Sequence, residues 1–195
     1  MLASDALTDL LLGIRTGGPI RRRMPDPVAR NVHYEPLRYA AMRLLLQRLP
    51  LAPDDIVCDL GCGKGRVVCW LSRQKIARAV GIDLDSRLTA IAKTNLSKLR
   101  GRKAPAEIRT EDAAYFSYEG INKIIMFNPF GEDVMREVVR RVEESIEISP
   151  REVHIVYLSP VHSHVIEESN YFSIVDQFVF KYESSEEMVN IYKAL

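Results

Sequence analysis

The chain has 195 residues, of which 47% are apolar and 27% are charged, and this composition is typical of one soluble domain with a single core. Its 27 basic and 26 acidic residues leave a formal net charge of +1, which excludes a global field that would attract nucleic acid or a membrane surface. No apolar run reaches the length of a membrane span, and acidic residues in the N-terminal apolar patch exclude a signal peptide.

The first 53 residues are predicted to form an N-terminal segment of two helices joined by a basic linker. Residues 1–14 and 36–49 have helical spacing, and the second stretch carries an apolar stripe after Pro36. The connection is rich in glycine and proline and contains the run Arg21, Arg22 and Arg23, with Arg15 and Arg30 nearby. Such a run usually indicates a solvated linker.

Strands and helices alternate from residue 54 to the end of the chain. We predict strands at 56–60, 77–83, 106–110, 123–127, 152–158, 172–182 and 188–194. We predict helices at 65–74, 86–99, 133–148 and 161–169, with Ser86 as the cap of the second.

This alternation predicts an α/β fold, a Rossmann-like sheet of seven strands that is mostly parallel and has helices on both faces. The last two strands break the pattern, because the short turn predicted at 183–187 can join only antiparallel strands. We therefore expect a C-terminal antiparallel hairpin.

The three cysteines, Cys58, Cys62 and Cys69, lie close together and are odd in number. They are poor material for a disulfide framework, which indicates a reducing, cytoplasmic location. Cys58 and Cys62 would need a second pair of ligands to hold a metal, and none is in sight. We therefore predict no metal site.

The stretch "DLGCGKGR", residues 59–66, follows the first predicted strand. Its glycines allow a tight turn and a close approach to a ligand, and a phosphate site is one possibility. A nucleotide-triphosphate loop is excluded because Arg66 and Val67 replace the required Lys-Ser/Thr pair. A dinucleotide loop fits poorly because Arg66 stands where its third glycine belongs, and it stays the weaker alternative.

The acid, the GxGxG spacing and the motifs downstream resemble the class I S-adenosylmethionine-dependent methyltransferases over residues 54–195. The resemblance implies that Gly61, Cys62 and Gly63 cradle the amino-acid part of S-adenosyl-L-methionine. It also implies that Asp59 helps to neutralise the ammonium group of that cofactor.

Two further acids complete the predicted cofactor site. Asp83, followed by Leu84, ends the second strand, where a carboxylate can accept both ribose hydroxyls; Asp85 is the substitute, and a helix cap is the alternative role of Asp83. By family analogy Asp112 accepts the adenine amino group and Ala113 offers a backbone amide, with Glu111 as competitor to Asp112.

The fourth strand ends in "MFNPFG". The resemblance implies that Asn128, Pro129 and Phe130 match the Asn/Asp/Ser-Pro-Pro-aromatic motif of amino methyltransferases, with a departure at the third position. An Asn carbonyl can accept hydrogens from an amine, proline fixes the backbone, and Phe130 offers a wall or a cation-π face. A simple turn closing the strand is the alternative.

Residues 32–45 resemble the lead-in of small bacterial methyltransferases related to the Dot1-like lysine methyltransferases, which makes Tyr34 and Glu35 candidates for lid or acceptor contacts. We therefore expect transfer of a methyl group to the nitrogen of a protein lysine or of a small amine. One alternative is an O-methyltransferase that uses His162 or His164 as a base, and another is a non-catalytic scaffold that only binds the cofactor. The sequence specifies neither the acceptor nor the oligomeric state.

Overall fold

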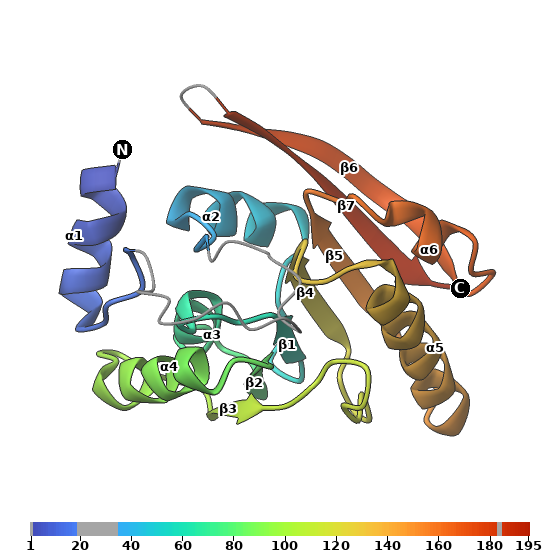
Figure 1. Ribbon diagram of the computed structural model, residues 1–195, viewed down its shortest axis with the longest axis horizontal. Helices are drawn as coiled ribbons and strands as arrows, with labels where there is room; N and C mark the ends of the chain where they lie inside the picture. Colours follow the sequence, from blue (N-terminus) through green and yellow to red (C-terminus); the bar gives the residue numbers. More distant parts are fainter. Residues whose placement is uncertain (1, 19–34, 183–184) are drawn as a thin grey trace.

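The computed structural model describes residues 2–18, 35–182 and 185–195. Figure 1 shows a central sheet with helices around it, and the strand order is β3-β2-β1-β4-β5-β7-β6. The strands are β1 (Ile56–Leu60), β2 (Arg78–Asp83), β3 (Ala106–Thr110), β4 (Lys123–Phe127), β5 (His154–Leu158), β6 (Phe172–Tyr182) and β7 (Ser185–Ala194). The first five pair in parallel, and β7 pairs antiparallel with both β5 and β6. The predicted fold class, including the C-terminal hairpin, is confirmed.

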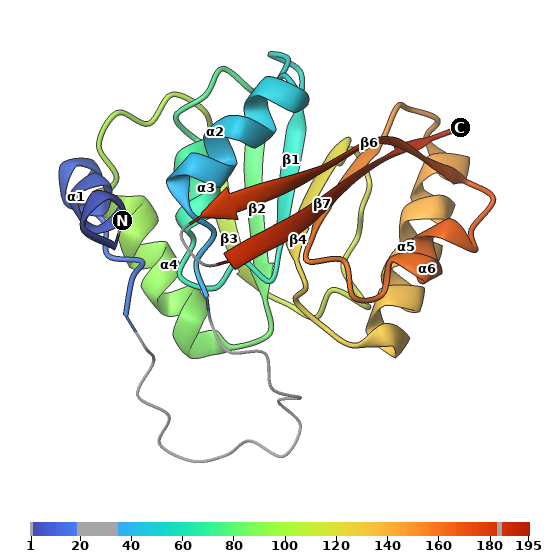
Figure 2. The same cartoon turned by 90° about the horizontal axis from the view of Figure 1, so that it is seen from above.

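The helices cover both faces of the sheet, as Figure 2 shows. They are α1 (Leu2–Leu12), α2 (Tyr39–Arg48), α3 (Arg66–Leu71), α4 (Ser86–Lys98), α5 (Glu132–Ile148) and α6 (Ser163–Glu167). Side chains of α1 to α4 share one apolar cluster with the sheet, and those of α5 and α6 share a second cluster on the other face. Because both faces are covered, the central strands are buried along nearly their whole length rather than at every second residue.

A glycine in β2 allows α3 to pack close to the sheet. A Cβ added at Gly81 would lie 2.5 Å from Val68 Cγ2 and 3.0 Å from Cys62 Cβ. Any side chain there would push the helix outward, and the loop that precedes this helix would move with it.

Several predicted element ends were wrong, each for a tertiary reason. α3 ends at Leu71 rather than 74, because the Ser72 carbonyl accepts hydrogen bonds from the amides of Lys103 and Ala104 and leads the chain away. The cap of α4 is Asp85 and not Ser86, since the Asp85 side chain accepts from the Arg87 amide.

Other ends moved by one to three residues. α2 begins at Tyr39 because Arg38 is extended, with φ −70° and ψ 144°. β7 begins at Ser185 because its pairing with β6 extends to Ser185, which stands opposite Tyr182. In addition, α5 begins at Glu132, β2 at Arg78 and β5 at His154, and α6 covers only Ser163–Glu167. None of the helices in the described ranges is long and apolar enough to cross a membrane.

Candidate cofactor and acceptor site

The sheet reverses its strand order beside β1, which has β2 on one side and β4 on the other. In an open parallel sheet, ligands bind beyond the carboxyl ends of the strands at such a switch point. The glycine loop after β1, the acids after β2 and β3, and the Asn-Pro-Phe motif after β4 all lie at this edge.

The glycine loop turns directly onto the end of β2. The amides of Gly61 and Cys62 both donate to the Ile82 carbonyl at 2.9 Å. Gly61 has a φ of +75°, and a Cβ added to it would lie 2.5 Å from the Cβ of Pro129. Only glycine suits both the left-handed backbone and this close contact. The loop after β1 and the motif after β4 therefore touch.

Cys62 points into the core rather than toward the edge of the sheet. Its side chain is 6% exposed and belongs to the apolar cluster beneath α3. Its amide is bonded to Ile82, and its carbonyl accepts from the Gly65 amide. Burial raises the pKa of its thiol well above the usual range. Cys62 thus sets the shape of the loop through its backbone and its packing.

Asp83 is the last residue of β2 and joins the glycine loop to the start of α4. Its Oδ2 accepts from the Gly63 amide at 2.8 Å, and its Oδ1 accepts from the Asp85 amide at 2.9 Å. Each oxygen keeps a second lone pair for a ligand. Burial raises the pKa of this carboxyl. Asp85, and not Asp83, caps the helix.

Asp59 is a buried carboxylate near the end of β1, only 6% exposed. Among the described residues, no donor lies within hydrogen-bond distance of the Asp59 side chain. Burial, and to a lesser extent the nearby Asp83 carboxylate, raise its pKa to about 8. A buried, unbonded acid beside a second acid is costly unless a cation binds there.

The two residues after Asp83 differ in their surroundings. Leu84 is 63% exposed, which is unusual for a large apolar side chain and leaves its surface available to a ligand. Asp85 is engaged by Arg87 at 2.6 Å, and this hydrogen bond lowers the pKa of Asp85. Asp85 is therefore less suited than Asp83 to accept ribose hydroxyls.

Asp112 and Ala113 form a turn after β3. The Asp112 side chain accepts from the Ala114 amide at 2.9 Å, and Ala113 is buried, its carbonyl accepting from the Tyr118 hydroxyl. The Glu111 amide donates to the Asp83 carbonyl at 3.2 Å, which holds this turn beside the end of β2. Residues 111–113 thus border the same edge as Asp83.

Asn128 follows β4 in a left-handed backbone conformation, with a φ of 39°. Its Oδ1 lies 3.3 Å from the hydroxyl of Tyr157, whose oxygen also accepts from the His162 amide at 3.2 Å. Since an amide N–H can only donate, the single proton of Tyr157 is left to point at Asn128. Tyr157 is fully buried, so it fixes the Asn128 side chain from the neighbouring strand.

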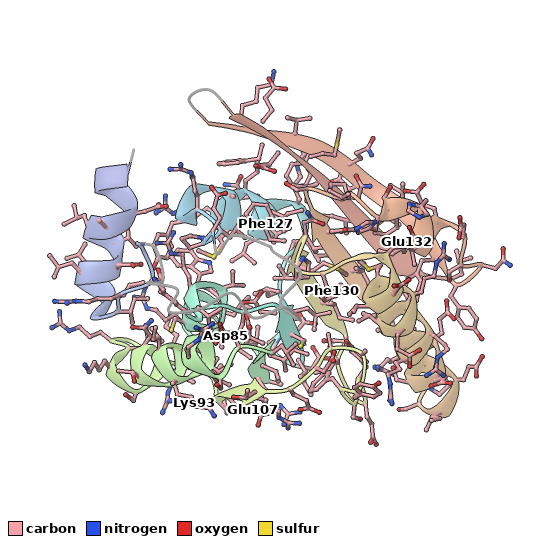
Figure 3. The ribbon with its side chains drawn as sticks, viewed as in Figure 1. Asp85, Lys93, Glu107, Phe127, Phe130 and Glu132 are labelled. Carbon is pink, nitrogen blue, oxygen red and sulfur yellow. The ribbon has the colours of Figure 1, made fainter. Side chains whose placement is uncertain are left out.

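The aromatic residues that flank Asn128 and Pro129 contribute to opposite faces of the sheet. Figure 3 labels Phe127 toward α2 and Phe130 near the start of α5. Phe127 packs against the apolar cluster of α1 to α4, whereas Phe130 packs against the cluster of α5 and α6. The Asn-Pro pair is thus held between two packed rings.

The candidate histidines lie beyond the end of β5. His164 is largely exposed, and its Nε2 lies 3.4 Å from Glu132 on α5. His162 reaches Tyr157 through its backbone amide, and its ring lies 6.2 Å from that of His164.

Tyr34 lies outside the described residues, as do Arg21, Arg22, Arg23 and Arg30. Glu35 lines a small pocket together with Phe127.

Comparison with known proteins identifies the fold. Residues 57–147 match the sequence family described as a methyltransferase domain. A protein-lysine N-methyltransferase from Saccharolobus islandicus (strain REY15A) is 27% identical over 157 residues, which cover 69% of this chain and 96% of the relative.

Solved structures of methyltransferases have the same fold as this chain. Magnesium protoporphyrin IX methyltransferase from Synechocystis PCC 6803, with bound S-adenosylmethionine, has a TM-score of 0.60 at 15% identity, covering 80% of this chain and 77% of its own. The N-methyltransferase NodS from Bradyrhizobium japonicum WM9 has a TM-score of 0.62 at 14% identity, covering 80% of this chain and 95% of its own. The chain therefore contains a methyltransferase domain and has the fold of the class I S-adenosylmethionine-dependent methyltransferases.

The residues of this methyltransferase fit its cofactor. S-Adenosylmethionine carries a cationic sulfonium and an ammonium group, and the buried Asp59 with the half-buried Asp83 beside it is suited to positive charge. The cofactor has no phosphate, so its binding does not require a basic side chain at the loop. A carboxylate-flanked glycine loop is therefore consistent with this cofactor and a poor match for a dinucleotide.

Sequence reasoning missed how the methyltransferase holds its glycine loop in place. Lys64 Nζ donates to the carbonyls of Gly17 and Gly18 at 3.0 and 2.6 Å. Arg66, 4% exposed, donates to Thr16 Oγ1 at 2.6 Å and to Asp5 at 3.1 Å. The only sequence signal was the presence of two basic residues in a loop without a phosphate to bind.

Proposed function

We propose that this enzyme methylates a nitrogen atom, either in the side chain of a protein lysine or in a small amine. The observation that carries the proposal is the Asn128 side chain, held by the buried Tyr157 hydroxyl at 3.3 Å. When bound, S-adenosylmethionine supplies a methyl group attached to a positively charged sulfur. The Oδ1 of Asn128 keeps a lone pair that can accept an amine N–H and so orient the nitrogen.

The backbone around Asn128 supports the same role. A left-handed φ in a non-glycine residue is uncommon and costs free energy, and such residues concentrate at functional sites. Pro129, packed against Gly61, fixes the chain directly after it. The lysine N-methyltransferase relative, at 27% identity, favours the same acceptor atom.

We propose that Asp59, Gly61, Cys62, Gly63, Asp83, Leu84, Asp112, Ala113 and Asn128 surround the cofactor, with Tyr34 as a further contact. In this proposal Asp59 neutralises the ammonium group and Asp83 accepts the ribose hydroxyls. The segment of residues 1–53 would select the acceptor, because part of it, from Glu35 to Ala41, lines the pocket beside β4.

An oxygen acceptor is the second candidate, and it would need a base to remove the hydroxyl proton. His162 and His164 lie beyond β5, but His164 is engaged with Glu132 on an exposed surface. Alanine at either position is expected to leave turnover with an amine unchanged. A loss of methyl transfer confined to hydroxyl acceptors would favour the second candidate.

Cofactor binding tests the proposed site directly. Calorimetric titration with S-adenosylhomocysteine should show binding to the wild type and a loss of about ten-fold or more in Asp83→Asn, because charge-assisted hydrogen bonds to the ribose are weakened. Asp85→Asn is the matched control, since asparagine also caps helices and the neighbouring charge is removed equally. Its affinity should change little. A wild type that binds neither the cofactor nor its demethylated product would refute the proposal.

A further inference from the structure

Helix α1 buries acidic side chains and exposes leucines, the reverse of an ordinary surface helix. Asp9 is only 5% exposed, whereas Leu7, Leu10 and Leu11 are 55%, 70% and 64% exposed. Residues at positions i, i+3 and i+4 lie on one face of a helix, so the three leucines form a single apolar strip. A helix that covers a core normally turns such a strip inward.

The buried contacts of α1 fix this orientation. The Arg66 guanidinium donates to Asp5 at 3.1 Å and lies 3.5 Å from Asp9. The Asp9 carboxylate also accepts from the Tyr39 hydroxyl at 2.6 Å. If the helix rotated to bury its leucines, the buried Arg66 cation would lose both acids, and such a loss is costly. The leucines are therefore held at the surface, and an apolar strip held there is typical of an interaction site.

A group of cations lies beside the leucines. From Ser86 to Ala106 the chain has six basic residues and no acidic one, although its net charge is only +1. The end of this stretch adjoins α1, since the Arg100 amide donates to the Leu12 carbonyl at 2.9 Å, and Figures 1 and 2 both show α1 beside α4 at one end of the molecule. Within the part of the chain that the structure describes, these exposed side chains form no ion pair: Arg15, Lys98, Arg100, Arg102 and Lys103.

We propose that these leucines and cations, which we call the α1/α4 surface, dock on an anionic lipid bilayer. The leucines enter the boundary between the headgroups and the acyl chains, and the cations face the anionic headgroups. An apolar strip or a basic cluster alone gives only weak, reversible attachment, whereas a peripheral protein is held by the two together. The proposal concerns where the enzyme is held and does not depend on which acceptor it methylates.

Other partners fit the α1/α4 surface less well. A second copy of the chain would bring the same cations together across a two-fold axis, where like charges repel. Three leucines on one helix are also little beside the roughly 800 Å² per partner that a stable dimer buries. A nucleic acid would leave the leucines in water, because single strands stack on aromatic rings and duplexes are bound by polar contacts. An anionic bilayer satisfies both kinds of side chain.

Flotation of the full-length protein with lipid vesicles tests the proposal. We expect binding to vesicles of equal parts phosphatidylcholine and phosphatidylglycerol, and this binding should weaken as salt is added, because salt screens the charges on both sides. Vesicles of phosphatidylcholine alone should bind at least about ten-fold more weakly, since only the leucines then contribute. Failure to bind either kind of vesicle, or equal binding to both, would overturn the proposal.

Variants of the leucines test the apolar contribution. Leu10→Gln combined with Leu11→Gln changes only exposed side chains, and it should weaken binding to the anionic vesicles by about ten-fold or more. Ile148→Gln is the matched control, because this residue is 81% exposed at the end of α5. It should bind as the wild type does.

Variants of the cations test the electrostatic contribution. Arg102→Gln combined with Lys103→Gln should weaken binding by about five-fold for each charge removed. Lys181→Gln removes one cation from the hairpin, where it pairs with Glu186, and should have no effect. The affinity for S-adenosylhomocysteine and the melting temperature are measured for every variant and should match the wild type, which excludes misfolding as the cause of a loss.

Three results would overturn the proposal and leave the proposed function standing. The first is that the leucine or cation variants bind vesicles as tightly as the wild type. The second is that the control variants lose as much binding as they do. The third is a dimer in analytical ultracentrifugation that separates in the leucine variant, because a second copy would then cover the leucines.

Discussion

At the scale of single residues, the raised pKa of Asp59 predicts that the stability of the fold depends on pH. Its pKa is about 8 in the folded chain against an ordinary value of 3.8. The folded state therefore binds this proton more tightly than the unfolded state does. The contribution of this proton to the free energy of folding is present in full below about pH 4, and it is lost as the pH rises through about 8.

Asp59→Asn should remove this dependence. We expect the melting temperature of the variant to fall less than that of the wild type between pH 5 and pH 9, and to exceed it by several degrees at the upper end. Its affinity for S-adenosylmethionine should drop, because the ligand cation loses its partner. Asp54→Asn, at an exposed position before β1, should keep the wild-type slope in thermal unfolding. Identical slopes in the two variants would contradict the assignment.

A second prediction at this scale concerns the hydroxyl of Tyr157. Tyr157→Phe removes the hydroxyl that links Asn128 to the His162 amide, while the ring still fills its buried place. Stability should fall by about 1 kcal/mol, and turnover of a lysine-containing peptide by about ten-fold, with little change in KM for the cofactor.

The matched control for this variant is Tyr192→Phe. That tyrosine is equally buried, and its hydroxyl bonds to Asn190 and Glu167, away from the end of β4. It should lose comparable stability in urea unfolding without a loss of turnover. If both variants lose turnover alike, Tyr157 has only a structural role.

At the scale of elements, the N-terminal segment is bound to the glycine loop through Arg66. The guanidinium donates to Thr16, Asp5 and the Leu37 carbonyl, and lies 3.5 Å from Asp9. Asp9 in turn accepts from the Tyr39 hydroxyl at 2.6 Å. One buried cation therefore joins α1, the start of α2 and the first residue of α3.

Removing this cation should be strongly destabilising. Arg66→Met leaves the buried carboxylate of Asp9 and the half-buried one of Asp5 without their cationic partner, and the loss in free energy of unfolding should reach about 3–5 kcal/mol, measured by urea denaturation. Arg140→Met breaks only exposed pairs with Glu137 and Glu144 on α5, so it should change stability little. If Arg66→Met loses no more free energy of unfolding than this control does, the buried contacts of Arg66 do not contribute to stability.

At the scale of the whole molecule, local patterns were enough for most of the sheet. The strands at 56–60, 106–110, 123–127 and 172–182 have the expected bounds. Those at 56–60 and 123–127 are central parallel strands buried on both faces, so their apolar runs can be recognised without knowing their partners. Helix ends were less predictable. α3 ends where the carbonyl of Ser72 meets Lys103 and Ala104, some thirty residues along the chain.

By itself, the sequence determined the fold class, the cofactor and the positions of Asp59, Gly61 and Asp83, since the loop and its acids lie within one strand-helix-strand unit, from β1 to the end of β2, and the spacing there carries the chemistry. Only the tertiary structure decided what holds and flanks that unit. Tyr157 reaches Asn128 across 29 residues, Ser159 reaches Glu187 across 28, and Arg66 reaches Thr16 across 50. Such contacts depend on how strands and helices are brought together, and no local periodicity encodes them.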